Sequence, residues 1–471
     1  MTAGDTRTSA ERNKRRRDRV VAILVLSAPM ALANAACGGV PDDGRIPSCG
    51  YFVAVTGSDH NEGTSVTTPF GTLEMAQAAL RRGRSKVVCL RAGVYRPRSP
   101  LVLSSADNGE TWRYYTPDGV GSAILDGGGN LDSIIAIDPG ASNIRINGLT
   151  LQNFGAAGIH VEPRGATSNA ITIENNNVGH GGNPGVTSAA IIVENTTNAV
   201  VANNYVHDML TGGISMYAYN AGETLNGSVV ENNVVLNTVE GISDSGAIYT
   251  EMLSTARSSL TIKNNYISDY GHSGGYGAIG IYLDEGANHV TVTGNVIAPP
   301  TERSVPFRND GGAAFTNAGY DNTFSGNIVD LGDSGRVFAS LNYGYVAYGE
   351  RGNVYTGNII ISRFAGSSQQ TNMNGLTGYA YFQNLAPSSN YTIENNVYWN
   401  YASGGSVFTQ GVLAGDRNPI VVDPQISGWT YTIASNSPVY RPPVNFTPIL
   451  GGWGPAGFVI PRTRTEPSNP H

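Results

Sequence analysis

The chain has 471 residues, of which 60 are glycine and only 14% are charged. Acidic residues outnumber basic ones 36 to 29, and the lysines are only Lys14, Lys86 and Lys263. This balance leaves no basic face for nucleic acid or for an anionic membrane. The many glycines and asparagines favour short strands joined by tight turns in one continuous all-β body.

Residues 1–36 have the pattern of an export signal. A basic stretch at residues 12–19 precedes an apolar stretch at residues 20–32, which is too short to span a bilayer comfortably, and small residues follow. We therefore predict a secreted protein with no transmembrane segment. The run Cys37-Gly-Gly resembles the start of a bacterial lipoprotein, although Asn34 stands where that family usually has leucine. Lipid anchoring through Cys37 is thus the alternative to plain secretion.

Residues 45–95 are predicted to form an N-terminal capping segment. A strand-like run at 51–55 leads to a helix at 69–80 with its cap near Thr72, and a second strand-like run follows at 86–90. Export permits disulfides, and two of the three cysteines flank or lie in these runs. We expect Cys49 and Cys89 to pair, with two separate buried thiols as the alternative. The cysteines show no metal-ligand spacing.

A repeat of the form Ile-x-Ile-x-x-Asn-x-Val begins after residue 141. Its second asparagine recurs 28 to 38 residues apart, with Gly148 as an earlier candidate marker, at Asn176, Asn204, Asn233, Asn265, Asn295, Asn327, Asn358 and Asn396. Near-constant spacing with strand-like alternation predicts a solenoid, because a leucine-rich repeat would need its leucine ladder and a propeller blade is longer. The recurrent asparagine is interpreted as a structural ladder at a sharp bend.

The capping segment carries a family resemblance. Its motifs Tyr-Phe-Val-Ala-x-x-Gly-Ser-Asp at 51–59 and Ala-Gly-Val-Tyr at 92–95 resemble the N-terminal cap of right-handed parallel β-helix proteins of the pectate-lyase-like superfamily. The resemblance implies an all-β, right-handed parallel β-helix over residues 96–430. A short helix would cover its open end, since an exposed sheet edge invites association. Residues 431–471 would form a C-terminal cover and tail.

Two successive coils carry similar polar strings, at residues 244–251 and 280–286. Strand alternation that points Ile248 and Thr250 into the bore points Tyr249 and Glu251 outward. Continuing this register through the repeat predicts one external column of Glu162, Glu194, Tyr217, Glu251, Asp284 and Asn317. Stacked acids repel one another and raise at least one pKa, an arrangement that active sites or Ca²⁺ sites retain.

These two strings also resemble a signature of β-helix glycoside hydrolases. The signature is Asp-x-Gly-Ala-Ile-Tyr followed by Gly-Ile-Tyr-Leu-Asp-(Asp/Glu)-Gly, and its two candidate acid and base aspartates match Asp244 and Asp284. Glycoside cleavage needs two carboxyl groups. If Asp284 pairs with Glu251, the separation approaches the roughly 5 Å of a retaining enzyme; if it pairs with Asp244, a wider gap suits inversion. The sequence does not choose, so all three acids are candidates.

Other residues of these coils are candidates for substrate binding. Tyrosines either stack on sugar faces or form a structural ladder along the sheet, and the histidines either line a cleft wall or belong to polar surface. The candidates are Tyr217, Tyr249, Tyr282, Glu194, Glu285, His207, Asp208 and His272.

The leading expectation is a secreted glycoside hydrolase, or a transglycosylase, that acts on a largely neutral polysaccharide or oligosaccharide with no cofactor and no metal. A polysaccharide lyase or uronate epimerase is the alternative, and it would need cationic groups or Ca²⁺ to neutralise the uronate. Arg257 and Lys263 are the only basic residues in the sequence between Arg164 and Arg303, which disfavours that alternative. A non-catalytic glycan-binding β-helix is the third hypothesis.

Overall fold

The computed structural model describes residues 48–118, 121–162, 164–186, 188–242, 244–253, 258–271, 278–298, 314–317, 319–332, 339–342, 351–363, 382–383, 391–405, 416–428 and 430–461. All of them belong to one compact unit, residues 36–471. The predicted export signal at 1–36, Cys37, Arg257 and His272 lie outside the described residues. No helix in the described part of the chain is long and apolar enough to span a membrane.

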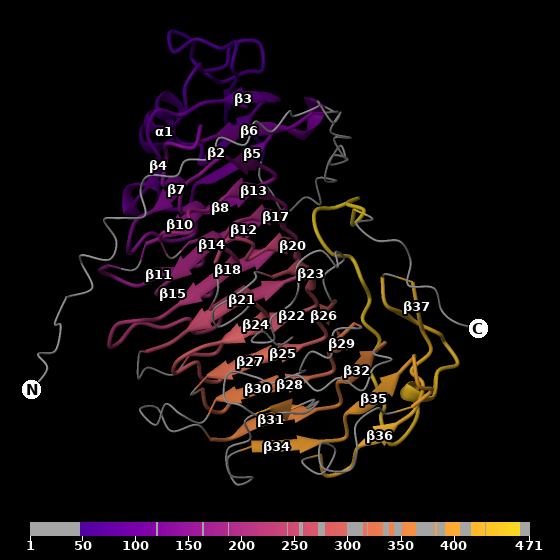
Figure 1. Ribbon diagram of the computed structural model, residues 1–471. Coiled ribbons are helices and arrows are strands. Elements are labelled where there is room, and N and C mark those ends of the chain that lie inside the picture. Colours follow the sequence, from indigo (N-terminus) through magenta and orange to yellow (C-terminus); the bar gives the residue numbers. More distant parts are fainter. Residues whose placement is uncertain are drawn as a thin grey trace, which may run out of the picture. The chain divides into compact units, whose positions relative to one another are not determined.

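Three long parallel sheets make up the body, and their strands stack one above another along the solenoid (Figure 1). The first sheet contains β1 (Tyr51–Val53), β2 (Val87–Leu90), β5 (Thr111–Tyr114), β8 (Arg145–Asn147), β12 (Thr172–Glu174), β16 (Val200–Ala202), β19 (Val229–Glu231), β22 (Thr261–Lys263), β25 (Thr291–Thr293), β28 (Thr323–Ser325), β31 (Asn353–Thr356) and β34 (Tyr391–Glu394).

The second sheet, on which the candidate acids lie, contains β4 (Leu101–Leu103), β7 (Ser133–Ile137), β10 (Ala157–Val161), β14 (Ala189–Glu194), β18 (Gly212–Tyr217), β21 (Ser245–Glu251), β24 (Ala278–Leu283), β27 (Ala314–Asn317), β30 (Ala339–Asn342) and β33 (Phe382–Gln383). The third sheet contains β3 (Gly93–Tyr95), β6 (Ala123–Asp126), β9 (Thr150–Gln152), β13 (Asn177–Gly181), β17 (Tyr205–Met209), β20 (Val234–Thr238), β23 (Tyr266–Tyr270), β26 (Val296–Ile297), β29 (Ile328–Asp330), β32 (Ile359–Ser362), β35 (Val397–Asn400) and β36 (Ile420–Val421).

Short elements complete the described structure. They are α1 (Leu73–Arg82), the 3₁₀ turns η2 (Ser105–Asp107), η3 (Thr116–Asp118) and η4 (Pro438–Tyr440), the parallel pair β11 (Ser168–Asn169) and β15 (Thr196–Thr197), and the antiparallel pair β37 (Ile426–Ser427) and β38 (Thr432–Ile433).

Each full coil runs from the first sheet through the asparagine bend to the third sheet and then to the second. Strands β12, β13 and β14 form one coil, and β16, β17 and β18 form the next. Their in-register pairing stacks like residues, as in Ile173 on Val201 and Val178 on Val206. The inward side chains form one continuous apolar core. The predicted all-β solenoid is therefore confirmed.

The asparagine bend is held by a ladder of side-chain amides. The Nδ2 of Asn204 donates to the Oδ1 of Asn233 at 3.0 Å and to the carbonyl of Ile173 at 2.9 Å. The same contacts repeat from Asn176 to Asn396, where the ladder ends on Asp416. All of these amides are buried. The predicted structural role of the recurrent asparagine is confirmed.

The residue before each ladder position adopts a left-handed backbone conformation, as in Asn203 with φ 54° and Gly294 with φ 64°. Asparagine and glycine tolerate this conformation best, which explains the Asn-Asn and Gly-Asn pairs in the repeat. Gly148 has φ 70° and pairs in register with the left-handed position, while the following Leu149 takes the ladder position. The interpretation of Gly148 as an earlier marker was therefore wrong by one residue.

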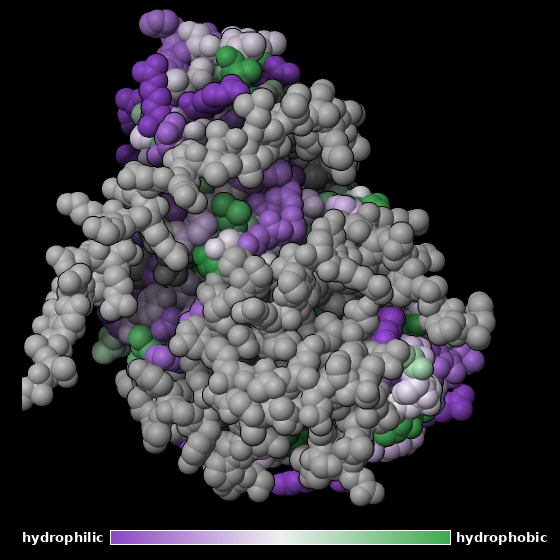
Figure 2. Space-filling model, viewed as in Figure 1, coloured by the Kyte–Doolittle hydropathy of each residue, from purple (hydrophilic) through white to green (hydrophobic). Residues whose placement is uncertain are grey.

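The N-terminal end is covered by α1, as predicted. The Thr72 hydroxyl accepts a hydrogen bond from the Met75 amide at 3.2 Å and so caps the helix. Leu80 packs into the core beneath the helix, and the predicted Cys49–Cys89 disulfide ties β2 to the residues that precede β1. On the face shown in Figure 2, this end of the unit presents mostly hydrophilic residues, which suits a covered solenoid end.

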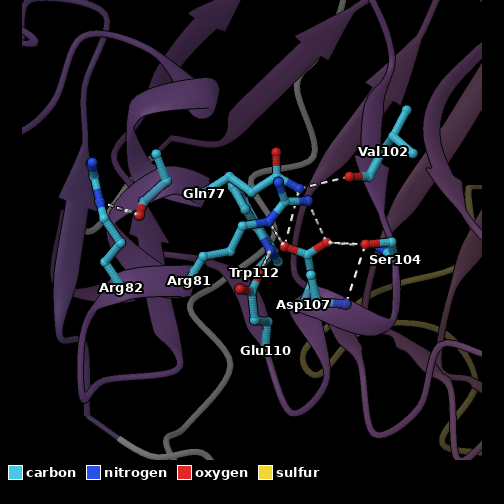
Figure 3. Close-up of polar contacts among 10 residues, drawn as sticks. Gln77, Arg81, Arg82, Val102, Ser104, Asp107, Glu110 and Trp112 are labelled. Atoms are coloured by element: carbon cyan, nitrogen blue, oxygen red, sulfur yellow. Dashed lines mark hydrogen bonds and ion pairs between the residues drawn. The ribbon is translucent and has the colours of Figure 1, made fainter.

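An ionic network joins the cap to the first coils (Figure 3). Arg81 donates from Nε and Nη2 to the two carboxylate oxygens of Asp107, at 2.6 and 2.7 Å. Glu110 accepts from the indole of Trp112 at 3.0 Å and is fully buried. Burial raises the pKa of Glu110 to about 7.

The C-terminal segment returns along the outside of the third sheet. Its apolar side chains pack on outward residues of β20, β23, β26 and β29, which form a second hydrophobic cluster outside the bore. The amide of Gly454 donates to the carbonyl of Asn232 at 2.7 Å, and the Trp453 ring lies 5.3 Å from that of Tyr266. The described part of this segment, residues 430–461, thus connects the end of the chain to its middle coils.

Candidate functional site

The candidate site lies on the outer face of the second sheet. In β21 the side chains of Ile248 and Thr250 are fully buried, and Ile248 belongs to the bore. Tyr249 and Tyr282 belong instead to a separate cluster on the outer face. The predicted alternation is therefore confirmed.

The predicted external column also matches the observed register. Glu194 pairs with Tyr217, and Tyr217 pairs with Glu251. One coil further, the amide of Asp284 donates to the carbonyl of Thr250 at 2.7 Å, which continues the β21–β24 pairing beside Glu251. By the same continuation, Glu162 precedes Glu194 in register and Asn317 follows Asp284.

Three acids and two tyrosines of this face form one chain of hydrogen bonds. The Tyr249 hydroxyl lies 2.5 Å from Oδ2 of Asp284 and 3.0 Å from Oε2 of Glu251. The Tyr282 hydroxyl lies 3.1 Å from Oδ1 of Asp244 and also hydrogen-bonds Asp284. The order is therefore Asp244, Tyr282, Asp284, Tyr249, Glu251, with a hydroxyl between each pair of acids. We call these five residues the acid–tyrosine chain.

The three acids of the chain differ in their exposure to solvent and in their electrostatic surroundings. Asp284 is buried at 8% exposure, Glu251 is half-buried, and Asp244 is the most exposed. Burial, helped by the charge of Asp284, raises the pKa of Glu251 to about 7. Partial desolvation and then the charge of Asp284 raise the pKa of Asp244 above its ordinary value, against the opposing effect of its hydrogen bond from Tyr282. Asp284 is thus the centre of charge that acts on both neighbours.

A cavity of about 640 Å³ opens beside the chain of acids. Asp244, Glu251 and Tyr249 lie in its wall, so two of the acids face the space directly. Its described lining carries no basic side chain. The other lining residues are Pro184, Gly185, Val186, Ser188, Tyr217, Tyr219, Gly241, Ile242 and Ser245.

Sequence reasoning missed much of this wall. Pro184 to Val186 and Gly241 with Ile242 come from the connections between the third and second sheets, which do not share the repeat and gave no signal. Tyr219, by contrast, is one of the tyrosines that the sequence offers for stacking on sugar faces or shaping the cleft. Its ring stacks on that of Tyr217 with centroids 4.8 Å apart and extends the aromatic surface.

The remaining predicted residues fall in several places. Glu194 is buried and accepts from His160 Nε2 at 2.8 Å, a partner that the register would have revealed. Glu285 follows Asp284, and burial followed by the charges of Asp284 and Asp244 raises its pKa. His207 and Asp208 lie on β17 of the third sheet and are not in the cavity lining. His272 lies outside the described residues.

Comparison with known proteins agrees with this architecture. Residues 133–329 match the family model described as "Right handed beta helix region". A solved structure described as "Glycoside hydrolase" aligns over 78% of this chain and 98% of its own, at 10% identity and a TM-score of 0.52. The chain is a right-handed parallel β-helix. No curated protein matches its sequence.

Other solved structures align with this β-helix at lower scores. Pectate lyase Pel9A aligns over 86% of this chain and 94% of its own, at 13% identity and a TM-score of 0.44. PfbA, a surface adhesin of Streptococcus pneumoniae, aligns over 69% and 82%, at 13% identity and a TM-score of 0.47. At such identities the likeness concerns the fold, and function has to be argued from the site.

Proposed function

We propose that the protein is a carbohydrate-active enzyme, a glycoside hydrolase or transglycosylase that uses carboxyl groups of the acid–tyrosine chain. The observation that carries the proposal is the hydroxyl of Tyr249, which lies within hydrogen-bond distance of both Glu251 and Asp284. One hydroxyl has one proton to donate. A protonated Glu251 satisfies the geometry, because it donates to the Tyr249 oxygen while Tyr249 donates to Asp284.

The proposed roles follow from this arrangement. Glu251, with a pKa of about 7, is the general acid that protonates the leaving oxygen. Asp284, which contacts the lining residue Tyr249 but is not itself in the described lining, is assigned as the charged partner that attacks the anomeric carbon or activates water. Oε2 of Glu251 and Oδ2 of Asp284 lie 3.0 and 2.5 Å from the Tyr249 hydroxyl. The distance between these two carboxylate oxygens therefore cannot exceed the sum of those two distances. That limit favours the short separation of roughly 5 Å that retaining enzymes use. Asp244 is the second candidate for the acid, at the other end of the chain.

A largely neutral glycan is the substrate class that fits best. The described cavity wall carries acids, tyrosines and small residues, and a uronate would meet negative charge without a basic partner there. Lys263 lies on β22 of the first sheet and pairs with Glu231 at 2.9 Å, away from the cavity. This disfavours the lyase or epimerase alternative, whose chemistry needs such a cation or Ca²⁺. The fold shared with a glycoside hydrolase supports the proposal.

Action outside the cell remains part of the proposal. The Cys49–Cys89 disulfide is of a kind that persists in oxidising compartments, which supports export.

The experiment that tests the proposal compares substrates with good and poor leaving groups. Aryl glycosides with an activated leaving group need little protonation, whereas natural glycosidic linkages need it fully. We expect Glu251→Gln to lose about 100-fold or more of kcat/KM on oligosaccharides and much less on activated aryl glycosides. We expect Asp284→Asn to lose activity on both substrates.

The matched variant Asp244→Asn separates the two candidate acids. If Asp244→Asn shows the leaving-group pattern and Glu251→Gln does not, Asp244 is the acid. If all three variants keep full activity on every substrate of a glycan panel, the proposed site is wrong. Products that absorb in the ultraviolet as unsaturated uronates would instead support a lyase.

A further inference from the structure

A second cluster of polar residues lies on the third sheet, outside the acid–tyrosine chain. His180 on β13 and the adjacent His207 and Asp208 on β17 each offer one ligand atom, and these atoms lie within 4.8 Å of one another. His180 comes from one coil and the other two residues from the next. The Nδ1 of His207 and the Nδ1 of His180 lie 2.7 and 3.7 Å from Oδ2 of Asp208.

Each ring nitrogen of His207 faces the oxygen of a neighbouring side chain. Its Nδ1 faces the carboxylate of Asp208 at 2.7 Å, and its Nε2 faces Oδ1 of Asn177 at 2.7 Å. A neutral imidazole has a single N–H, so it can donate to only one of these oxygens. Donation from Nε2 to Asn177 turns the lone pair of Nδ1 toward the point where His180 and Asp208 converge. Two ligand atoms on one tetrahedral zinc ion lie roughly 3.4 Å apart. The 2.7 Å contact between His207 and Asp208 would therefore open slightly for one ion to bind all three groups.

Backbone conformation explains part of the cluster but not His207. His180 and Asp208 have left-handed φ values of 54° and 50°, and asparagine, aspartate and histidine are the side chains that tolerate this region. His207 pairs in register with Gly179 and Leu236 and has no such conformational reason to be polar.

The neighbour of His207 on β13 is a glycine, which both the backbone and the ring of His207 require. A Cβ at Gly179 would lie 3.0 Å from Cε1 and Nε2 of His207 and 2.4 Å from its carbonyl oxygen. The φ of Gly179 is not in the left-handed region. The missing side chain at 179 therefore makes room for His207, and Tyr205 stacks on the ring with centroids 4.2 Å apart.

The groups around the cluster hold its ligand atoms in orientation. The Oδ1 of Asn177 lies 2.7 Å from Nε2 of His207, and Nδ2 of Asn237 donates to the other oxygen of Asp208 at 2.6 Å. Such outer partners orient the ligands of metal sites and raise their basicity. Two imidazoles and one carboxylate are a ligand set that Zn²⁺ and related divalent transition metals accept, with a further position left for water.

We propose that His180, His207 and Asp208 bind one divalent transition-metal ion of the zinc type, which fastens two neighbouring coils. This proposal departs from the sequence-based expectation of no metal. The residues that follow β13, which carries His180, enter the cavity wall at Pro184 to Val186. The residues that follow β20, which pairs with β17, enter the wall at Gly241. The ion would therefore stabilise the wall of the proposed active site without entering its chemistry.

The test uses the full chain, treated with chelator and then titrated with ZnCl₂. We expect one zinc ion per chain by isothermal titration calorimetry, with a rise in the thermal unfolding temperature. Co²⁺ in place of Zn²⁺ should give the visible absorption of a low-symmetry site with nitrogen ligands. The variants His180→Ala and Asp208→Asn change solvent-accessible side chains, so both should fold. Each should weaken zinc binding by about tenfold or more.

His160 offers a matched control. Its two ring nitrogens also face carboxylates, Glu162 at 3.1 Å and Glu194 at 2.8 Å, but on opposite edges of the ring, so these oxygens do not converge. His160→Ala should keep full zinc binding. The proposal is overturned if the native chain binds no zinc, or if His180→Ala and Asp208→Asn bind it as tightly as the native chain does. Because calorimetry reads binding directly, the outcome is independent of any glycosidase activity.

Discussion

At the scale of single residues, the shared hydroxyl of Tyr249 determines the properties of the site. It contacts two carboxyl groups with one proton to donate, so the pair is stable when one of the acids is protonated. The charge of Asp284 at one end favours a proton on Glu251 at the other. Desolvation of Glu251 and the charge of Asp284 both favour a proton on Glu251, and such unequal surroundings are how two carboxyl groups acquire different roles.

The first prediction concerns the pH dependence of catalysis. A general acid must be protonated to act, and the protonated fraction of Glu251 falls as the pH rises through its pKa of about 7. The kcat/KM for oligosaccharides should therefore fall about tenfold per pH unit above roughly pH 7. The measurement is a pH–rate profile of the native enzyme on a glycan that it cleaves.

Two variants check the assignment of this falling limb to Glu251. In the proposed arrangement protonated Glu251 donates to the Tyr249 oxygen, so Tyr249→Phe removes that acceptor and should move the limb to lower pH. Tyr282→Phe instead removes the hydrogen bond that Asp244 accepts from Tyr282, and it should leave the limb in place. A limb that moves with Tyr282→Phe alone would assign it to Asp244.

A second prediction concerns Glu110, buried beneath the cap. Its pKa is raised from 4.5 to about 7 by folding, so the folded state favours the protonated form. Its contribution to stability is therefore greatest below pH 4.5, falls as the pH rises from 4.5 to 7, and stays constant above 7. Glu110→Gln should raise the free energy of unfolding at pH 8 by up to about 3 kcal/mol, with a smaller gain at pH 5.

Thermal unfolding at several pH values measures this difference. Glu74→Gln, on the exposed side of α1, is the control and should show no such trend. A gain from Glu110→Gln that is equal at pH 5 and pH 8 would mean that Glu110 carries no proton in the folded state.

At the scale of elements, the repeated bend is the unit from which the solenoid is built. Each bend combines one left-handed residue with one buried amide, and the amide of each coil bonds the amide of the next. The left-handed position and the ladder position are both commonly asparagine in the sequence, but they have different structural roles. The first is chosen for its backbone and the second for its side chain.

A third prediction follows from this division. Asn233→Ala removes the acceptor of Asn204 and the donor to Asn265 inside the buried ladder, leaving polar groups without partners. It should lower the free energy of unfolding by about 3 kcal/mol or more. Asn232→Gly, one residue away, keeps the left-handed conformation and should change stability by less than about 1 kcal/mol. Denaturant titration compares the two, and equal losses would contradict the assigned roles.

The elements also show how far sequence reasoning reaches. The repeat predicted the strands, the ladder and the column from Glu194 to Asp284, because in a solenoid each residue's neighbours lie one repeat away in the sequence. The hydroxyl bridges were not predicted, since strand alternation gives the direction of a side chain but not where its tip lies. The cavity wall at Pro184 to Val186 was missed because it lies outside the repeat. Predicting that His180 lies close to Asp208 would have required the register of the third sheet.

At the scale of the whole described unit, the C-terminal segment adds contacts that a simple solenoid lacks. In a repeat protein each coil contacts only its neighbours, so stability is close to a sum of local terms. Here residues 430–461 connect the end of the chain to the middle coils. Tyr431 donates to Asp330 at 2.8 Å, and Phe458 packs on Tyr205 of β17 with centroids 4.5 Å apart. Coils far apart along the solenoid are therefore linked by one segment.

The last prediction concerns removal of this link. Deleting residues 430–471 should expose outward apolar residues of the third sheet, among them Val234, Val296 and Ile328, which lie in the hydrophobic cluster beneath the segment. Binding of a hydrophobic dye should rise and the unfolding temperature should fall. Hydrogen exchange should speed up in β20, β26 and β29, while β14 and β18 of the second sheet, which the segment does not cover, should keep their protection.

The milder variant Trp453→Ala keeps the chain complete and should give the same local pattern near Tyr266, with a smaller loss of stability. It keeps the prediction testable if the shortened chain fails to fold. Uniform acceleration of exchange in all three sheets would show that the segment stabilises the solenoid as one cooperative unit. Unchanged exchange in β20 would show that the segment contributes nothing to the coils that it covers.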